Sequence, residues 1–95
     1  MSDTKIRYAV GLYEKSENSF LAYGVGEKAG LALADVRTRA PYILSGRDRI
    51  SCVPVTEDWY ADADRVLHRF PVFWVRLPPF HMRGEVHEIE LRAEA

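Results

Sequence analysis

The residues best suited to chemistry are the histidines near the end of the chain and the acidic residues beside them. His81 and His87, with Glu85 or Glu88, include the ligand types that zinc and iron sites use. Side chains on a strand alternate between faces, so His87 would share a face with Glu85 but not with Glu88. His81 stands in a separate loop. The sequence therefore predicts no metal site.

A nucleophilic site would need a serine or a cysteine next to a histidine. The candidates are Ser51 and Cys52 on one side and His68, His81 and His87 on the other. No glycine-flanked nucleophile turn or oxyanion loop surrounds them. Cys52 is the only cysteine and stands in an apolar run, which is typical of a small buried side chain. The sequence predicts no catalytic residue and no cofactor, and it favours a protein that is not an enzyme.

Two glycines, Gly24 and Gly26, precede an expected helix, where phosphate-binding loops are found. The next glycine is Gly30, one residue away from the dinucleotide fingerprint, and no parallel βαβ unit surrounds the pattern. A turn that ends a strand explains these glycines better than a phosphate site does.

The segment from Arg69 to Arg83 is the strongest candidate for a binding site. Arginine alternates there with aromatic residues and prolines, a composition typical of protein hot spots and of platforms for single-stranded nucleic acid. No acidic residue lies from Arg65 to Gly84. The predicted partner-binding residues are Arg69, Arg76, Phe80, His81, Met82, Arg83, Arg47 and Arg49.

The hydrophobic core is the competing interpretation of the same segment. Residues 72–77 are apolar on both faces, which is typical of a buried central strand. That interpretation buries Phe73 and Val75 and leaves Phe80, Met82 and Arg83 for an interface.

The first half of the chain is expected to form a hairpin, a helix and a second hairpin. Alternation predicts a strand over 5–14, and a polar turn leads to a second strand over 20–25 that Gly24 and Gly26 break. Helical spacing over 27–40 ends at Pro41. Short strands over 42–44 and 49–53 follow, and Pro54 should end the second or place it at a sheet edge.

The second half contains the clearest helix, over 57–70. Thr56 is a good N-cap, acidic residues suit the first turn, and Pro71 should end the helix. Trp59 and Phe70 belong to its apolar stripe and should face the sheet. The apolar strand over 72–77, a rigid loop over 78–84 and a final strand over 85–92 complete the chain.

These elements predict an α+β fold, a two-layer sandwich in ββα-ββα-ββ order. An antiparallel or mixed sheet would carry two helices on one face. The 95 residues form a single domain, 1–95, in this interpretation. No residue motif assigns the chain to a known family.

Composition narrows the class of function. Hydrophobic residues make up 47% and charged residues 28%, as in ordinary globular domains, and the net charge of −1 supplies no general attraction to nucleic acid or to membranes. The polar start of the sequence has no signal-peptide core, which predicts a cytoplasmic protein without membrane contact.

The favoured function is binding of another macromolecule, most simply a protein, by occlusion, as an inhibitor, antitoxin, immunity-type protein or accessory subunit. One alternative is a small cofactor-independent enzyme or a ligand-binding homodimer with a pocket between sheet and helices. The other is a nucleic-acid binder that uses the arginine-rich patches.

Overall fold

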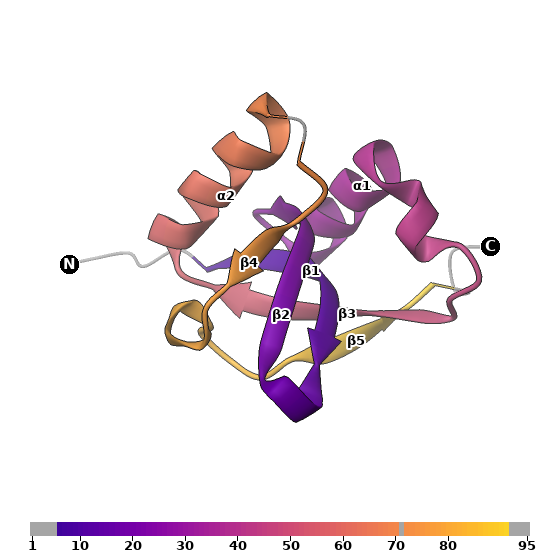
Figure 1. Ribbon diagram of the computed structural model, residues 1–95, viewed down its shortest axis with the longest axis horizontal. Helices are drawn as coiled ribbons and strands as arrows, with labels where there is room; N and C mark the ends of the chain where they lie inside the picture. Colours follow the sequence, from indigo (N-terminus) through magenta and orange to yellow (C-terminus); the bar gives the residue numbers. More distant parts are fainter. Residues whose placement is uncertain (1–5, 71, 92–95) are drawn as a thin grey trace.

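Five antiparallel strands and two helices make up the computed structural model, which describes residues 6–70 and 72–91 (Figure 1). The strands are β1 (Arg7–Glu14), β2 (Ser19–Gly26), β3 (Arg49–Val55), β4 (Val75–Leu77) and β5 (His87–Glu90), and the helices are α1 (Ala29–Arg39) and α2 (Glu57–Arg69). Short 3₁₀ turns are η1 (Lys15–Glu17), η2 (Pro41–Leu44) and η3 (Pro79–His81). The sheet order is β4-β2-β1-β3-β5, which confirms the predicted α+β class and the antiparallel sheet.

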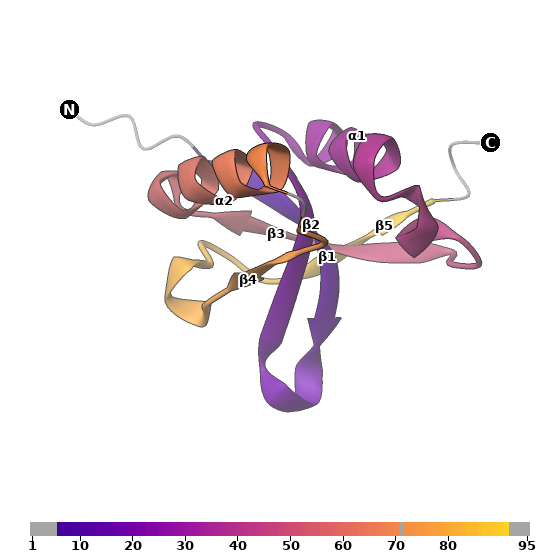
Figure 2. The same cartoon turned by 45° about the horizontal axis from the view of Figure 1, so that its top comes forward.

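The β1–β2 hairpin is the centre of the sheet. Asn18 closes its turn in the left-handed region, at a φ of 50° that asparagine tolerates better than most residues. The register shifts between Val10 and Gly11, and this bulge leaves Tyr23 without a partner on β1. Beyond Gly11, β1 no longer pairs with β3, so the tip of the hairpin extends away from β3 and β5 (Figure 2).

Helix α1 packs closely against the end of β2 because that strand carries glycines. A Cβ on Gly24 would lie 2.5 Å from Val36 Cγ2, and one on Gly26 would lie 2.5 Å from the backbone nitrogen of Ala32. Strand β2 continues through both glycines, so the prediction that they break the strand is wrong. Their role is to let a helix approach the sheet.

Helix α2 has the predicted cap and the predicted buried stripe. The Thr56 hydroxyl accepts a hydrogen bond from the Trp59 backbone nitrogen at 3.3 Å. Trp59 is buried on the sheet, as predicted, but Phe70 is 51% exposed, so its predicted place against the sheet is wrong. Phe70 follows the last helical residue, where the backbone has become extended. Pro71, the predicted helix stop, lies outside the described residues.

The two helices divide the sheet between them. α2 packs on a cluster that includes Ala9, Val53 and Val55, whereas α1 packs on one that includes Val10 and Cys52. Ala9 and Val10 are neighbours on β1, as Cys52 and Val53 are on β3, and neighbouring residues of a strand point to opposite sides of it. Each helix therefore contacts its own row of side chains.

Three predicted strands differ from those observed. Residues 42–44 form the 3₁₀ turn η2, which leaves one strand fewer than the predicted order. β4 is short and lies at the edge of the sheet, so the central strand predicted over 72–77 is wrong. β3 is interior, but its pairing with β5 stops at Cys52. Pro54 lies beyond this paired stretch, so no β5 residue is opposite it to accept the hydrogen bond that proline cannot donate. The predicted outermost residues of the first and last strands, Lys5 and Arg92, are outside the described ranges.

Candidate binding surface

The residues around β4 are more exposed than a core strand allows. Phe73 is 70% and Trp74 44% exposed, which overturns the expectation that Phe73 is buried. Leu77 is buried and Val75 is half-buried. Trp74 and Arg76 alternate with these two, so they point to the other side of the strand. The segment therefore contributes its inner row to the core and its outer row to the surface.

The outer row of β4 continues across the two neighbouring strands. Arg76 pairs with Leu21 of β2, and Leu21 pairs with Leu12 of β1. Leu12 and Leu21 are half-buried and belong to neither core cluster. This part of the sheet presents apolar side chains that neither helix covers.

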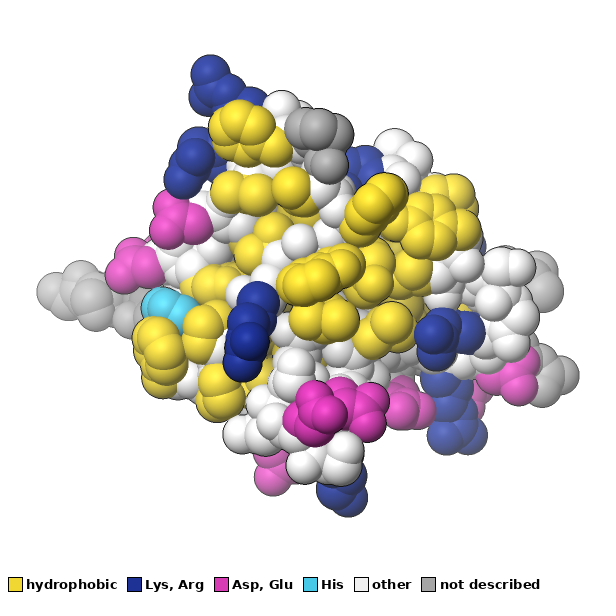
Figure 3. All heavy atoms as spheres, viewed as in Figure 1, with side chains coloured by type: hydrophobic (Ala, Val, Ile, Leu, Met, Phe, Trp, Pro, Cys, Tyr) yellow, Lys and Arg dark blue, Asp and Glu magenta, His cyan; other side chains and the backbone are white. Residues whose placement is uncertain are grey.

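Aromatic side chains extend this surface toward η2. Tyr42 and Phe73 meet edge to face, with ring centroids 6.5 Å apart and an interplanar angle of 87°. The pKa of Tyr23 is raised by burial and by nearby Tyr42, whereas Arg47 acts to lower it. We call the combined surface the aromatic face: Leu12, Leu21, Tyr23, Tyr42, Phe73 and Trp74. Figure 3 shows a broad apolar area over β4, β2 and β1 with basic side chains within and beside it.

Several arginines of the predicted site have no acidic partner among the described residues. Arg47 donates from Nε to the carbonyl oxygen of Ile43 at 2.7 Å. Within residues 6–70 and 72–91, the guanidinium groups of Arg69, Arg76 and Arg83 form neither a hydrogen bond nor an ion pair. Guanidinium stays charged at every physiological pH, so these groups remain available to an acidic ligand.

The loop after β4 splits the predicted binding residues into two kinds. Phe80 is 78% exposed and Arg83 is exposed, in keeping with a surface role. His81 is held by the fold, because its Nδ1 lies 2.8 Å from the Thr56 hydroxyl. Met82 is half-buried against the core cluster beneath α2. Phe80 contacts the His81 ring at 4.4 Å between ring centroids, with the two planes tilted by 40°.

The remaining predicted residues, Arg47 and Arg49, line a cleft of about 300 Å³ where β1 and β3 separate. Glu14 and Glu88 line the same cleft, and Arg49 approaches Glu88 at 3.8 Å. Both signs of charge are therefore present. Leu12 of the aromatic face also lines this cleft, so both arginines lie beside that end of the face.

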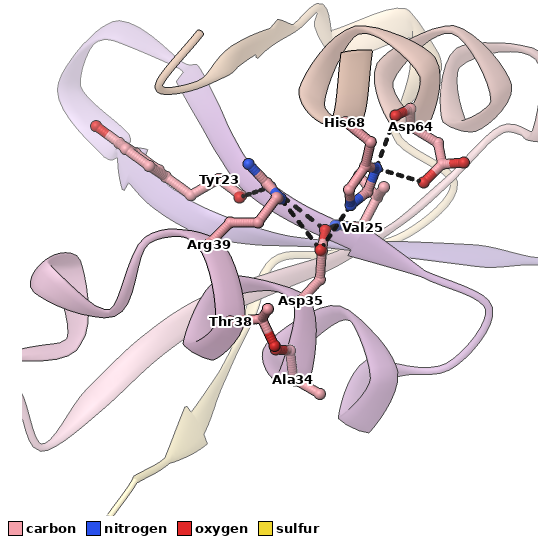
Figure 4. A network of polar contacts seen from close by, with 8 residues as sticks. All are labelled: Tyr23, Val25, Ala34, Asp35, Thr38, Arg39, Asp64 and His68. Atoms are coloured by element: carbon pink, nitrogen blue, oxygen red, sulfur yellow. Dashed lines mark hydrogen bonds and ion pairs between the residues drawn. The ribbon is translucent and has the colours of Figure 1, made fainter. Parts of the chain in front are cut away.

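The most extensive polar network joins α1, α2 and β2 around His68 (Figure 4). His68 Nε2 lies 2.8 Å from Asp35 Oδ1, and Nδ1 lies 2.8 Å from the backbone oxygen of Asp64 and 3.0 Å from its Oδ1. Asp35 also accepts hydrogen bonds from the Val25 backbone nitrogen at 3.0 Å and from Arg39 Nε at 3.1 Å. The guanidinium of Arg39 in turn donates to the Tyr23 carbonyl.

This network is suited to holding helices together rather than to catalysis. Burial alone would lower the pKa of His68, but the hydrogen bonds to Asp35 and to the Asp64 backbone outweigh it and raise the pKa. For Asp35, burial acts to raise the pKa, and the hydrogen bonds from Arg39 and His68 lower it overall. Both ring nitrogens of His68 are occupied, so neither is free to take a proton from a substrate.

The histidines do not converge. His68 and His81 lie near opposite ends of α2, whose 13 residues span about 20 Å, and His87 lies on β5. In the described part of the chain, no group of three or more His, Cys, Asp or Glu side chains could hold a metal ion. Burial raises the pKa of Cys52 to about 11, which keeps this thiol protonated and unreactive.

The sequence missed Tyr42 and Trp74 as surface residues. A three-residue apolar run such as Tyr42 to Leu44 cannot be assigned by periodicity, and an apolar strand is ordinarily core. Aromatic enrichment within 69–83 was the available signal for exposed aromatic side chains, and Trp74 lies in that segment.

Comparison with known proteins supplies no relative: no family model, curated protein or solved structure matches the chain. Among the residues described, neither helix has the length and apolar character needed to cross a bilayer.

Proposed function

We propose that this protein acts by binding another protein through the aromatic face, and that it is not an enzyme. The single observation that carries the proposal is the open part of the sheet, where Phe73, Trp74 and Tyr42 remain 44–70% exposed. Large aromatic side chains grouped on a surface, with arginine beside them, are the residue types that contribute most to protein interfaces. Occlusion of a partner's surface, as by an inhibitor, antitoxin, immunity-type protein or accessory subunit, needs nothing more.

The character of the face favours a protein over nucleic acid. Its middle is aliphatic, with Leu12 and Leu21 side by side on neighbouring strands. An apolar centre with charged residues at the rim is the common arrangement of protein interfaces. Nucleic acid would require cations that follow several phosphates, whereas this chain carries a net charge of −1.

The test is comparative capture from a lysate of the cells in which the protein is native. We expect the wild-type protein to retain a specific protein that Trp74→Ala loses. The matched control is Leu31→Ala, because Leu31 is 54% exposed but lies on α1. Equal capture by all three forms would contradict the proposal. Capture of oligonucleotides that falls steeply with salt would support the nucleic-acid alternative instead.

A further inference from the structure

The edge of the sheet beside the aromatic face offers little to an extended peptide. β4 has only three residues, and the carbonyl oxygen of its middle residue, Arg76, already accepts a hydrogen bond from Trp59 Nε1 at 3.1 Å. Strand addition depends on a row of free backbone groups along an edge. A partner of the aromatic face must therefore contact its side chains rather than extend the sheet.

The same side of the sheet already carries a helix. α1 covers the part where Val10 pairs with Gly24, and the aromatic face begins two residues further along β1, at Leu12. η2, which follows α1 along the chain, contributes Tyr42 to the face. An apolar helix stripe laid on an apolar sheet surface is the standard way to cover such a surface. The aromatic face thus has the form of a position for a second helix, on a side of the sheet where the chain itself supplies only α1.

The arginines at the borders of the apolar area indicate which charge that second helix should carry. Arg76 lies on β4 opposite Leu21, and Arg47 lines the cleft beside Leu12, so the two guanidinium groups stand at different borders of the apolar area. The Arg76 side chain has no partner among the described residues, and Arg47 bonds only a backbone carbonyl. Carboxylates are the groups that match such arginines in bidentate geometry.

A second copy of this chain fits less well. A two-fold contact would place the aromatic face on both sides of the interface, and the face itself contains no carboxylate for Arg76, since Glu14 and Glu88 lie in the cleft beside Arg47 and Arg49. Like charges brought together at an interface oppose association.

From this geometry we infer that the aromatic face takes an amphipathic helix of a partner protein, with apolar residues at helical spacing and acidic residues along its borders. This inference rests on the proposed function, because it names the partner's contact element. Leu12, Leu21 and Trp74 would receive the apolar stripe, and Arg47 and Arg76 would pair with the carboxylates.

The experiment is selection from a displayed library of random peptides of about 16 residues, long enough for roughly four helical turns. The wild-type protein is the bait, and peptides that also bind Trp74→Ala are removed. We expect the remaining peptides to carry apolar residues at spacings of three and four, with aspartate or glutamate beside them. Synthetic copies should gain helical circular dichroism on binding.

A charge exchange makes the test specific. Arg47→Glu with Arg76→Glu should weaken binding of a selected peptide roughly tenfold. Replacing the acidic residues of that peptide by lysine should restore binding to the doubly substituted protein. The matched control is Arg65→Glu, because Arg65 lies on the exposed side of α2 in an ion pair with Asp62.

Several results would overturn the inference. Selected peptides with alternating apolar residues would show that the face binds a strand. Selected peptides with basic residues in place of acidic ones would show that Arg47 and Arg76 do not choose the ligand. An absence of Trp74-dependent peptides, or a dimer that Trp74→Ala dissociates in sedimentation, would show that no such helix is bound. If capture from lysate nevertheless depends on Trp74, the proposed function stands and only the helical partner is wrong.

Discussion

Trp59 links the core to the edge of the sheet through a single side chain. It is 7% exposed, and its indole nitrogen donates to the Arg76 carbonyl at 3.1 Å. Trp59→Ala should lower the free energy of unfolding by about 3–5 kcal/mol, because it leaves a cavity and an unpaired carbonyl. Denaturant unfolding measures the change.

Trp74 supplies the control for that prediction. It is the only other tryptophan and is 44% exposed, so Trp74→Ala should cost less than about 1 kcal/mol. A loss below 1 kcal/mol for Trp59→Ala would show that the indole does not anchor α2 on the sheet.

His68 should make stability depend on pH. Its pKa is raised in the folded state, so its contribution is complete below the ordinary value of about 6.5 and is lost as pH rises through the folded value. The pKa of Asp35 is lowered, so its contribution is present above about 3.9 and is lost as pH falls through the folded value. The pair should stabilise the protein most between about pH 4 and 6.5.

The measurement compares urea unfolding of the wild type and His68→Gln from pH 4 to 8. Glutamine keeps hydrogen-bonding groups but cannot carry charge. We expect the difference in unfolding free energy to be largest in mildly acidic solution and to shrink toward pH 8. A difference that is constant over this range would mean that the charge of His68 contributes nothing.

At the scale of elements, α2 could be predicted because its signals were local. Thr56, the acidic first turn and the apolar stripe lie within the helix or next to it. The segment 42–44 could not be assigned, since the same three apolar residues suit a strand or a turn that starts at Pro41. The exposure of Phe73 and Trp74 depends on β4 being at an edge, which is decided by pairing with β2 far away in sequence.

The predicted site also divides into a part with local signals and a part that depends on contacts between distant segments. Local composition selected 69–83, where Phe80 and Arg83 are exposed, and their role in binding stays a prediction. The aromatic face needed Leu12 and Tyr42 from distant elements, and no spacing in the sequence joins them to Trp74.

Alanine substitutions at Gly24 and Gly30 test how α1 is positioned on the sheet. Gly24→Ala should destabilise the protein by about 1–3 kcal/mol, because the new Cβ would lie 2.5 Å from Val36 Cγ2 and 2.8 Å from the carbonyl oxygen of Ala32. Gly30→Ala should instead stabilise it by up to about 1 kcal/mol, since nothing lies within 4 Å and alanine favours a helix. Thermal unfolding of both variants distinguishes them, and equal effects would contradict the close approach of α1 to β2.

At the scale of the whole molecule, the arginines that form no ion pair are spread over several elements. In the part of the chain that the structure describes, they come from the segment after η2, from the C-terminal end of α2, from β4 and from the loop after η3. Acidic residues gather at the start of α2 and along β5. A net charge of −1 therefore conceals arginines whose charge no neighbouring carboxylate neutralises.

The loop after β4 should contribute to binding without contributing to stability. Phe80 is 78% exposed, and the guanidinium of Arg83 has no partner within 6–70 and 72–91. Pro78 and Pro79 restrict the backbone conformations of the segment that precedes Phe80 and Arg83. Holding the Phe80 and Arg83 side chains in a bound geometry therefore costs less ordering entropy than it would on a flexible loop. Phe80→Ala with Arg83→Ala should weaken binding of the captured partner while the melting temperature stays nearly unchanged. Calorimetric binding and thermal unfolding of the same double variant check this, with Trp74→Ala as the comparison. If affinity is unchanged and the melting temperature falls, the loop packs as core, and the aromatic face alone carries the interaction.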